Sequence, residues 1–238
     1  MVKVAIIPAR GGSKRIPRKN IKDFCGQPML SWPITAAINS GLFERIIVST
    51  DDSEIAAIAE QCGAEVPFIR PSSLADDHSA TVPVIQDAIT RLNLATSNQV
   101  CCIYPTAAFI QATVLQAAFE LLQQTGADFV MPVTEFSCPL ARALNLDLQG
   151  RLQLLQNENE NSRTQDCATH YHDIGQFYLG TAAAWLSPKA FYAQDVRGLT
   201  VPRYLAHDID TPEDWKYAEL VFSQLTKLAK IAIAENEN

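Results

Sequence analysis

The sequence predicts an α/β protein in which a largely parallel β-sheet lies between helices, in a single domain spanning residues 1–238. Three observations support this fold class. A chain of 238 residues is long enough to bury a large core. Its 47% hydrophobic and 19% charged residues are typical of a globular protein. In the first half of the chain, short apolar runs alternate with helical spacings, which favours parallel strands joined by helices.

Five apolar runs have the length of β-strands. They are Val2–Pro8, Arg45–Thr50, Glu65–Ile69, Gln99–Tyr104 and Ala127–Val133. Cys101 and Cys102 are adjacent in the fourth run, so we expect their side chains to face opposite sides of the sheet.

Apolar residues at helical spacing fill the segments between these runs. Between residues 51 and 62, Asp51 and Glu54 have the spacing of a capping box at the start of a helix. Two further helices are expected around residues 82–92 and 114–122. This order of elements matches a sheet covered on both faces.

Two prolines mark the starts of other helices. Pro33 belongs in the first turn of a helix that ends near Ser40, because proline has no amide proton to donate. Thr211 and Pro212 have the residue types of an N-cap and a first helical position. The apolar stripe that follows predicts packing against the core, and it consists of Trp215, Ala218, Phe222, Leu225 and Ala229.

The alternation of strands and helices is interrupted between residues 134 and 176. Ala141–Leu155 alternates weakly in polarity and predicts a hairpin with its turn near residues 147–151. The polar segment Gln156–Cys167 predicts a loop. We interpret residues 134–176 as an excursion from the domain that packs on a partner subunit.

Composition and charge exclude several classes of protein. A formal net charge of −7 opposes non-specific nucleic-acid binding. No apolar run approaches the roughly 20 residues of a membrane-spanning helix, and Pro8 and Arg10 interrupt the apolar start that a signal peptide needs. The six cysteines show no CxxC spacing. We therefore expect a cytoplasmic protein with reduced cysteines and no membrane or nucleic-acid partner.

A basic loop with two glycines follows the first predicted strand. Six Lys or Arg residues and no acidic residue lie between Arg10 and Lys22. Gly11 and Gly12 allow the backbone to approach an anion, which the basic side chains neutralise. A solvated surface loop is the alternative, but the coincidence of strand, glycines and unmixed charge favours a polyphosphate site.

An acidic segment near the end of the chain complements this loop, whereas other familiar sites have no match. The sequence lacks G-x-x-x-x-G-K-[ST], G-x-G-x-x-G, H-E-x-x-H and G-x-S-x-G. In an extended segment, Asp208 and Asp210 place both carboxylates on one side of the chain. Such acids could be solvated or cap the last helix. Together with the basic loop, they favour a Mg²⁺ site that phosphate oxygens complete.

The segment Ile6–Ile21 resembles the nucleotide-binding signature of the acylneuraminate cytidylyltransferases, which make CMP-activated nine-carbon keto sugars. The resemblance continues through Val48–Asp52, Gly63–Phe68, Arg70–Pro71, Tyr104–Thr106 and His207–Asp214. Phe24–Gly26, Tyr104–Ala107 and Asp173–Tyr178 are most similar to the pseudaminic acid branch of that family. The resemblance implies a nucleotide-diphospho-sugar-transferase-like, Rossmann-like fold, Mg²⁺ as cofactor, and a homodimer formed through the 134–176 excursion.

The resemblance also implies a reaction in which CTP and a nonulosonic acid give a CMP-sugar and pyrophosphate. Residues of the two main motifs take their roles from it: Arg10, Lys14 and Lys19 bind the triphosphate with help from Ser13 and the Gly11 and Gly12 amides, Asn20 holds the ribose or α-phosphate, Arg70 reads cytosine with Thr81 as a further base contact, and Asp208 and Asp210 hold Mg²⁺. No side-chain base is assigned. His207 is expected to orient the acidic segment, and His170 and His172 to be loop residues.

The sugar side of the predicted site departs from the sialic acid enzymes. Those enzymes commonly have glutamine where Tyr104 stands, which opposes N-acetylneuraminate as the substrate. Candidates for the sugar pocket are Gln176, Phe177 and Tyr178 for the acyl groups and Arg142 and Arg163 for the carboxylate, the arginines acting across a dimer interface. The alternatives are core packing for the aromatic residues and a surface position for the arginines.

Three other functions remain to be compared with this one. A related enzyme would act on N-acetylneuraminate, legionaminate or an eight-carbon keto-deoxy acid. A non-catalytic nucleotide-binding protein would be expected to lose a metal carboxylate or a loop lysine, and this chain keeps them. A nucleic-acid-binding module is supported by the basic loop alone, and the net charge of −7 opposes it.

Overall fold

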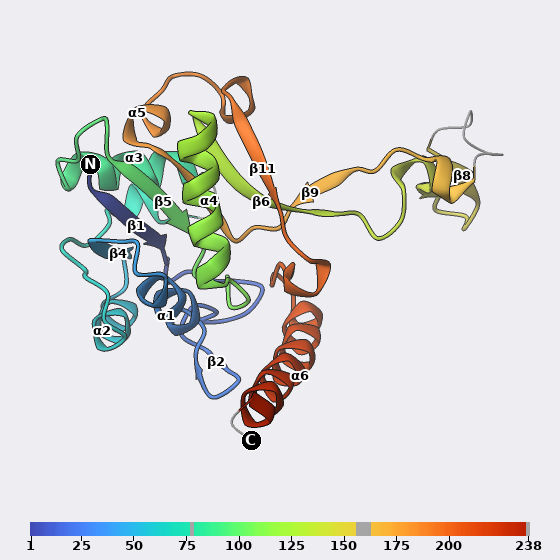
Figure 1. Cartoon of the computed structure of the whole chain (residues 1–238). Coiled ribbons are helices and arrows are strands. Elements are labelled where there is room, and N and C mark those ends of the chain that lie inside the picture. The colour runs from blue at the N-terminus through green and yellow to red at the C-terminus, as the bar shows by residue number, and fades with distance from the viewer. Residues whose placement is uncertain (77–78, 156–162, 237–238) are drawn as a thin grey trace.

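A β-sheet of seven strands forms the centre of the described part of the chain (Figure 1), in the order β11-β6-β10-β5-β1-β4 with β9 beside β6. This computed structural model describes residues 1–76, 79–155 and 163–236, with side chains up to Leu228. The strands are β1 (Lys3–Pro8), β4 (Arg45–Ser49), β5 (Gln99–Ile103), β6 (Phe129–Glu135), β9 (Tyr171–Asp173), β10 (Phe177–Thr181) and β11 (Val196–Thr200). β1 is parallel to β4 and β5, and β6 to β11, whereas β10 is antiparallel to β5 and β6. The predicted α/β fold with a largely parallel sheet is confirmed.

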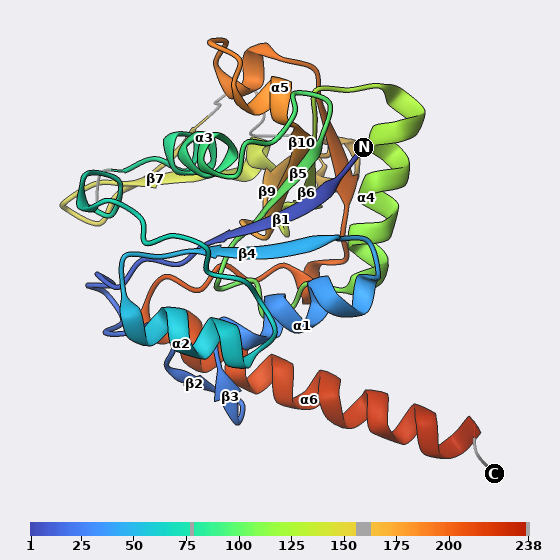
Figure 2. The same cartoon turned by 90° about the vertical axis from the view of Figure 1, so that its left-hand side faces the viewer.

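Helices cover both faces of this sheet (Figure 2). On one face α1 (Ser31–Ser40), α2 (Ser53–Gln61) and α4 (Ala112–Thr125) share a buried cluster with Ala5 and Ile7 of β1. On the other face α3 (Thr81–Arg91) and α5 (Ala182–Trp185) pack with Val4 and Ile6. Period-two alternation along β1 therefore supplies both cores. Cys101 and Cys102 belong to opposite clusters, as the sequence predicts.

A third cluster joins the basic loop to the last helix, α6 (Pro212–Asn236). Phe24, in the small ladder of β2 (Asp23–Phe24) and β3 (Gln27–Pro28), packs edge-on against Trp215 and Phe222. Further along α6 the helix projects away from the body (Figure 2). The predicted stripe packs as expected at Trp215, Ala218, Phe222 and Leu225, while the side chain of Ala229 lies outside the described residues. No described helix is both long and apolar enough to cross a membrane.

The start of α6 has a cap that fixes the preceding acidic segment. Thr211 Oγ1 accepts the amide of Asp214 (3.2 Å), and Asp214 Oδ2 accepts the amide of Thr211 (2.7 Å). This reciprocal pair is a capping box with aspartate at the third helical position. Asp214 Oδ2 also accepts the amide of Asp210 (3.1 Å). The backbone that carries Asp208 and Asp210 is therefore tied to the helix.

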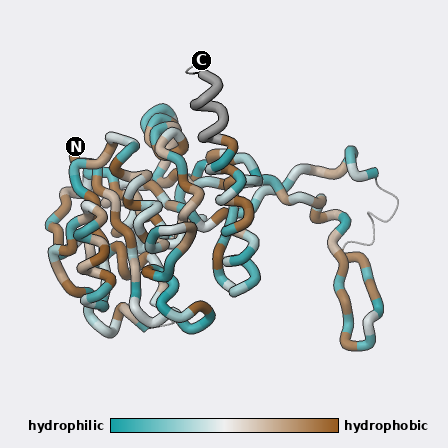
Figure 3. Tube along the Cα trace, turned by 90° about the horizontal axis from the view of Figure 1, so that it is seen from below, coloured by the Kyte–Doolittle hydropathy of each residue, from teal (hydrophilic) through white to brown (hydrophobic). Residues whose placement is uncertain are grey.

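The excursion leaves the body as an arm, which we define as residues 136–155 and 163–170 (Figures 1 and 3). It contains a hairpin of β7 (Leu144–Leu146) and β8 (Leu152–Leu154), which confirms the hairpin predicted at Ala141–Leu155. Asp147 closes the turn, because its Oδ1 accepts the amides of Gln149 and Arg151. Most of the predicted 156–167 loop falls on residues 156–162, outside the described chain. The short 3₁₀ turns are Ser72–Leu74, Leu140–Arg142, Thr164–Asp166, Phe191–Ala193 and Arg203–Leu205.

Two local predictions need correction, whereas Pro33 lies in the first turn of α1 as expected. Glu65–Ile69 is not a strand: only isolated bridges at its two ends join it to the β4 region, since Pro67 has no amide proton for a ladder. The N-cap of α2 is Asp52 rather than Asp51, and its carboxylate accepts the Glu54 and Ile55 amides. β10 was not predicted.

Candidate active site

A cavity of about 500 Å³ lies at the carboxyl ends of β1 and β5. Ligands of open α/β sheets bind at this edge of the sheet. The loop after β1, the segment before α3, the turn after β5, the β9–β10 segment and the approach to α6 supply the following lining: Arg10, Ser13, Lys14, Arg15, Lys19, Asn20, Arg70, Ser79, Thr81, Tyr104, Pro105, Thr106, Asp173, Gly175, Tyr178, Asp208 and Asp210. Most of the residues that the sequence proposed for a nucleotide and a metal therefore surround one space.

The basic loop and the late acidic segment, which are far apart in the sequence, meet inside this cavity. Lys19 Nζ donates to the carbonyl oxygen of Ile209 (2.8 Å) and lies 3.2 Å from Asp210 Oδ1. Arg15 Nη1 lies 2.9 Å from Asp210 Oδ2. Arg15 was not singled out from the sequence, although it lies inside the basic run. These contacts place the acidic segment directly beside the basic loop.

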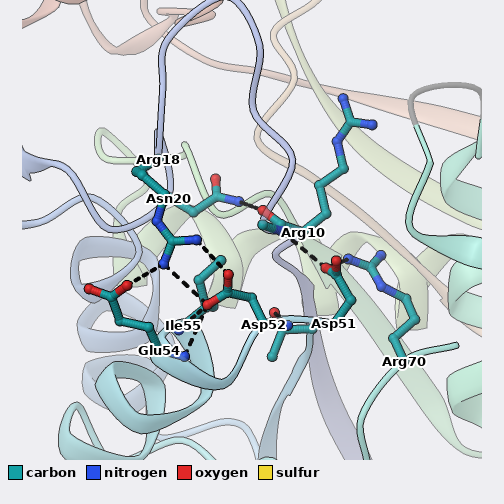
Figure 4. Close-up of polar contacts among 10 residues, drawn as sticks. Arg10, Arg18, Asn20, Asp51, Asp52, Glu54, Ile55 and Arg70 are labelled. Atoms are coloured by element: carbon teal, nitrogen blue, oxygen red, sulfur yellow. Dashed lines mark hydrogen bonds and ion pairs between the residues drawn. The ribbon is translucent and has the colours of Figure 1, made fainter. Parts of the chain in front are cut away.

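Other cations of the basic loop anchor it instead of facing the cavity (Figure 4). Arg18 has a left-handed backbone (φ 56°), and its guanidinium lies 2.5 Å from both Asp52 Oδ2 and Glu54 Oε2 at the start of α2. Hydrogen bonding to Arg18 holds the pKa of Asp52 below its usual range. The Lys22 ammonium lies 4.4 Å from the ring centre of Trp215. The loop thus contains both cavity-lining cations and structural cations.

The two glycines of the loop lie outside the lining of the cavity. The Gly11 amide donates to Asp51 Oδ1 (3.0 Å). A β-carbon at Gly11 would lie 2.8 Å from Asp52 Oδ2, so a larger residue would displace the α2 cap. Gly12 has open space around its α-carbon. Gly11 therefore allows the close approach of loop and helix, a different task from the predicted anion contact.

Arg70 is a buried cation with unused hydrogen-bond donors. The residue is 4% exposed, and its Nε and Nη2 atoms have no hydrogen-bond partner among the described residues. Burial lowers its pKa, which the Asp51 carboxylate opposes from 3.8 Å (Figure 4). Leaving such donors unpaired is costly. Because Arg70 lines the cavity, a ligand with acceptor atoms would satisfy them.

Two tyrosines, Tyr104 and Tyr178, form another wall of the cavity, the tyrosine wall, and each is hydrogen-bonded to another side chain. The hydroxyls of Thr81 and Tyr104 are 2.8 Å apart, and the rings of Tyr104 and Tyr178 meet edge-on at 5.7 Å. The Tyr178 hydroxyl donates to the carboxylate of Asp173. Burial raises the pKa of Tyr104 to about 12 and also raises that of Tyr178. Both hydroxyls therefore stay neutral at physiological pH.

Several candidates for the sugar side do not line the cavity. Phe177 is fully buried in the sheet core, because it faces the opposite side of β10 from Tyr178. Gln176 is buried, and its Nε2 donates to the Leu205 carbonyl (2.6 Å). Arg142 and Arg163 lie on the arm, outside the cavity lining. Within one chain, Tyr178 alone of the five lines the described cavity.

A second cavity of about 190 Å³ adjoins the first and has a mostly apolar lining. Its lining consists of Thr81, Val82, Tyr178, Trp185, Phe191 and Tyr192, so Thr81 and Tyr178 belong to both cavities. Phe191 and Tyr192 were not proposed from the sequence, because a short aromatic pair before a strand has the pattern of ordinary core residues.

The two acids of the late segment differ in their surroundings. Partial burial raises the pKa of Asp208, and the negative charge of Asp210 raises it further. Asp208 nevertheless lines the cavity. Gly175, at φ +62°, brings the backbone against Asp208, where a β-carbon would lie 3.7 Å from its carboxyl carbon. Within the described residues no cluster of three or more metal-ligating side chains occurs. Two carboxylates do suffice for Mg²⁺ when phosphate oxygens and water supply its other ligands.

The histidine beside these acids lies outside the cavity lining. The His207 ring packs 4.3 Å from that of Phe109, and its Nε2 lies 3.0 Å from the Tyr204 carbonyl oxygen. Burial lowers its pKa. His207 therefore packs against residues outside the cavity lining, and its role in orienting the acidic segment stays a prediction.

Residues 4–232 match the family model described as "Cytidylyltransferase". The chain belongs to this family. It is 40% identical over 224 residues to a pseudaminic acid cytidylyltransferase of Campylobacter jejuni subsp. jejuni serotype O:2, covering 93% of this chain and 97% of that protein. It is 33% identical over 226 residues to the CMP-N,N'-diacetyllegionaminic acid synthase of Legionella pneumophila subsp. pneumophila, covering 91% and 94%.

Two solved structures share the fold of this cytidylyltransferase. A CMP:2-keto-3-deoxy-manno-octonic acid synthetase complexed with CTP superposes with a TM-score of 0.70 at 15% identity, covering 94% of this chain and 99% of that one. A 4-diphosphocytidyl-2C-methyl-D-erythritol synthase from Anaerococcus prevotii superposes with a TM-score of 0.63 at 14% identity, covering 93% and 98%. These likenesses support the nucleotide-diphospho-sugar-transferase-like, Rossmann-like fold expected from the sequence.

Proposed function

We propose that this cytidylyltransferase transfers CMP from CTP to the anomeric hydroxyl of a nonulosonic acid, pseudaminic acid being the favoured sugar, and releases pyrophosphate. The observation that carries the proposal is one cavity whose wall holds cations of the basic loop beside the Asp208 and Asp210 carboxylates. A polyphosphate needs the first group of residues, and a magnesium-bound phosphoryl centre needs the second. The names of the relatives supply the cytidine and the acid sugar.

The nucleotide half of the cavity suits CTP. Arg10, Lys14 and Lys19 provide positive charge for the triphosphate and for the leaving pyrophosphate, and Ser13 adds a hydroxyl. The free donors of Arg70 match the acceptor edge of cytosine, with Thr81 nearby. Asn20 Nδ2 donates to the Arg10 carbonyl (2.9 Å), which orients its amide for the ribose or the α-phosphate.

Asp208 and Asp210 are proposed to hold Mg²⁺. When bound, Mg²⁺ would neutralise charge on the α-phosphate and lower the pKa of the attacking hydroxyl. The chain's own residues prepare this place: Arg15 and Lys19 hold Asp210, and the α6 capping box fixes its backbone. Positioning of the hydroxyl in line with the leaving pyrophosphate is then the main task of the protein.

The tyrosine wall and the second cavity suit a sugar with acylamino groups. An acyl methyl group can leave water in the apolar space that Val82, Trp185 and Phe191 line. Tyr104, in place of the glutamine common in sialic acid enzymes, favours pseudaminic acid over N-acetylneuraminate. Legionaminic acid is the alternative sugar. A non-catalytic nucleotide-binding protein is the alternative class, which the intact set of cations and carboxylates opposes.

We also propose a homodimer formed through the arm. The hairpin carries five leucines with more than half of their surface exposed: Leu144, Leu146, Leu148, Leu152 and Leu155. Figure 3 shows this hairpin away from the body, and these leucines are exposed in the described chain. A second copy would cover them, and Arg142 and Arg163 would then reach the partner's cavity. Leu146→Glu should convert the dimer to a monomer in analytical ultracentrifugation; an unchanged sedimentation coefficient would exclude the arm.

A cytoplasmic location completes the proposal. All six cysteines lie in the described part of the chain and are free, as expected in a reducing compartment.

Pyrophosphate release is the direct test of the function. The purified chain is incubated with Mg²⁺ and with CTP, UTP or ATP, each with pseudaminic, legionaminic or N-acetylneuraminic acid. We expect release with CTP and pseudaminic acid, and at least about tenfold lower kcat/KM with the other sugars. Release with none of the sugars would refute the function, and a preference for another sugar would refute the choice of pseudaminic acid.

A further inference from the structure

Asp173 lies between the arm and the tyrosine wall, and it has no role in the proposed CMP transfer. It ends β9, where it pairs in register with Val133 of β6, and its side chain lines the main cavity. Oδ1 accepts the amide of Gly175 (2.8 Å), and Oδ2 accepts the hydroxyl of Tyr178. Both carboxylate oxygens of Asp173 therefore accept hydrogen bonds from the segment that follows β9.

The contact with Asp173 determines what Tyr178 can offer a ligand. A carboxylate accepts hydrogen bonds and donates none, so the phenolic proton of Tyr178 is directed to Asp173. Burial and this hydrogen bond raise the pKa of Tyr178, which keeps the proton on its oxygen. The hydroxyl oxygen of Tyr178 keeps acceptor capacity, which a cavity ligand shares with the neighbouring Tyr104 hydroxyl. Tyr104 is not directed in this way, because either hydroxyl of its pair with Thr81 can donate.

We propose that Asp173 is a positioning residue that sets sugar specificity, by holding the Tyr178 hydroxyl as a hydrogen-bond acceptor for an acylamino N–H of the sugar. The inference rests on the proposed function and deepens it. Tyr178 also lines the apolar cavity. An N–H that donates to its oxygen therefore places the attached acyl group beside Val82 and Phe191. An oxygen at the same place in the sugar would face the Tyr178 lone pair, and a buried pair of acceptors is costly.

The test compares wild type with Asp173→Asn, Tyr178→Phe and the double variant. Asparagine keeps the shape but can donate to Tyr178 and release its proton toward the cavity. Tyr178→Phe keeps the ring and removes the hydroxyl, so it also tests the proposal if Asp173→Asn folds poorly. Asp195→Asn is the control, because this exposed acid pairs with Arg197 at the far strand β11. Steady-state KM values for sugar and CTP are measured by pyrophosphate release, with thermal midpoints for folding.

Each single variant should raise the KM for pseudaminic acid about tenfold and change the KM for CTP less than twofold. The double variant should be no worse than the more affected single variant, because both changes remove one interaction. With analogues that carry an ester oxygen in place of each acylamino N–H in turn, wild type should prefer the amide at one position, and Asp173→Asn should reduce that preference.

The outcomes separate this inference from the proposed function. An unchanged sugar KM, additive effects in the double variant, or parallel rises in both KM values would overturn the role of Asp173 while leaving CMP transfer in place. A wild-type chain that releases no pyrophosphate with any of the sugars would overturn both.

Discussion

The nucleotide half and the sugar half of the cavity are built by different forces. The nucleotide half combines the clustered cations of the basic loop, held by ion pairs to Asp52, Glu54 and Asp210, with the buried Arg70. The sugar half joins side chains from α3, β9 and β10 with the turn after β5, and it is held by hydroxyl hydrogen bonds and ring contacts. The carboxylate in this half, that of Asp173, accepts a hydrogen bond from Tyr178. Charge recognises the part of the substrate common to nucleotides, and directed hydrogen bonds suit the part that differs between sugars.

This contrast also applies to rigidity. An ion pair at the surface is weak and is screened by solvent, so the basic loop needs several anchors, which include Arg18 on α2 and Lys22 on Trp215. The half-buried hydroxyl pair of Thr81 and Tyr104 is short and directional, so a change at either residue removes the partner of the other. We therefore expect changes in the nucleotide half to alter CTP use and changes in the sugar half to alter sugar use.

The carboxylate that borders both halves should show the largest effect. Asp210→Ala should lower kcat by about 1,000-fold or more with Mg²⁺ present, because the metal would lose one of its two protein ligands. The side chain is partly exposed, so circular dichroism should show an intact fold. Asp195→Asn serves as the control for loss of an exposed acid. Near-normal turnover of Asp210→Ala would remove this residue from the reaction.

Within the loop, two lysines provide a matched pair. Lys19→Ala should raise the KM for CTP about 30-fold and slow turnover, since Lys19 lines the cavity and a charge-assisted contact to phosphate is lost. Lys22→Ala, which changes the same residue type over the ring of Trp215, should leave the KM for CTP within about twofold. Equal effects of the two changes would show that the loop acts by net charge alone.

In the sugar half, Phe191→Ala should raise the KM for the sugar about tenfold with little change for CTP. Phe191 lines the apolar cavity, with its ring centre 5.3 Å from that of Tyr178, so its removal lets water reach the acyl group. Substrate titrations at fixed saturating partner measure both constants. A rise confined to the CTP constant would break the division into two halves.

The division also explains how far the sequence predicts the site. Two contiguous signals located much of the nucleotide half: one charged run, in which the family resemblance selected Arg10, Lys14 and Lys19, and one acidic pair, Asp208 and Asp210. All of them line the cavity. Arg15 was overlooked because unmixed charge does not show which cations face inward and which, like Arg18, face a neighbouring helix.

The sugar half could not be predicted in the same way, because no run of residues contains it. Phe177 and Tyr178 are neighbours in sequence, yet alternation along β10 sends one to the core and the other to the cavity. An antiparallel strand between β5 and β6 interrupts a parallel order that local periodicity cannot reveal. Long-range pairing determines these features, and one sequence carries little signal for it.

The smallest expected effect concerns the anchor of the basic loop. Asp52→Asn retains an N-cap for α2, because asparagine also caps helices well, and it removes the charge that Arg18 pairs with. Arg18 is partly exposed, so the loss should lower the thermal midpoint at pH 7 by about 1–4 °C. The pKa of Asp52 is lower in the folded chain than in the unfolded one. Its contribution to stability is therefore present above the unfolded pKa of about 4 and is lost as pH falls through the folded value.

Differential scanning calorimetry of wild type and Asp52→Asn at pH 7 and at pH 3 measures this contribution. The difference in midpoint should be smaller at pH 3, because this pH lies below the unfolded pKa of about 4, where the stabilising contribution of ionised Asp52 has begun to be lost. A difference that stays constant or grows on acidification would mean that the ionisation of Asp52 does not account for its contribution to stability, and that the contacts with the Glu54 and Ile55 amides, which asparagine would then make less well, are the main contribution. In that case the loop is anchored by the helix cap, and the ion pair to Arg18 is incidental.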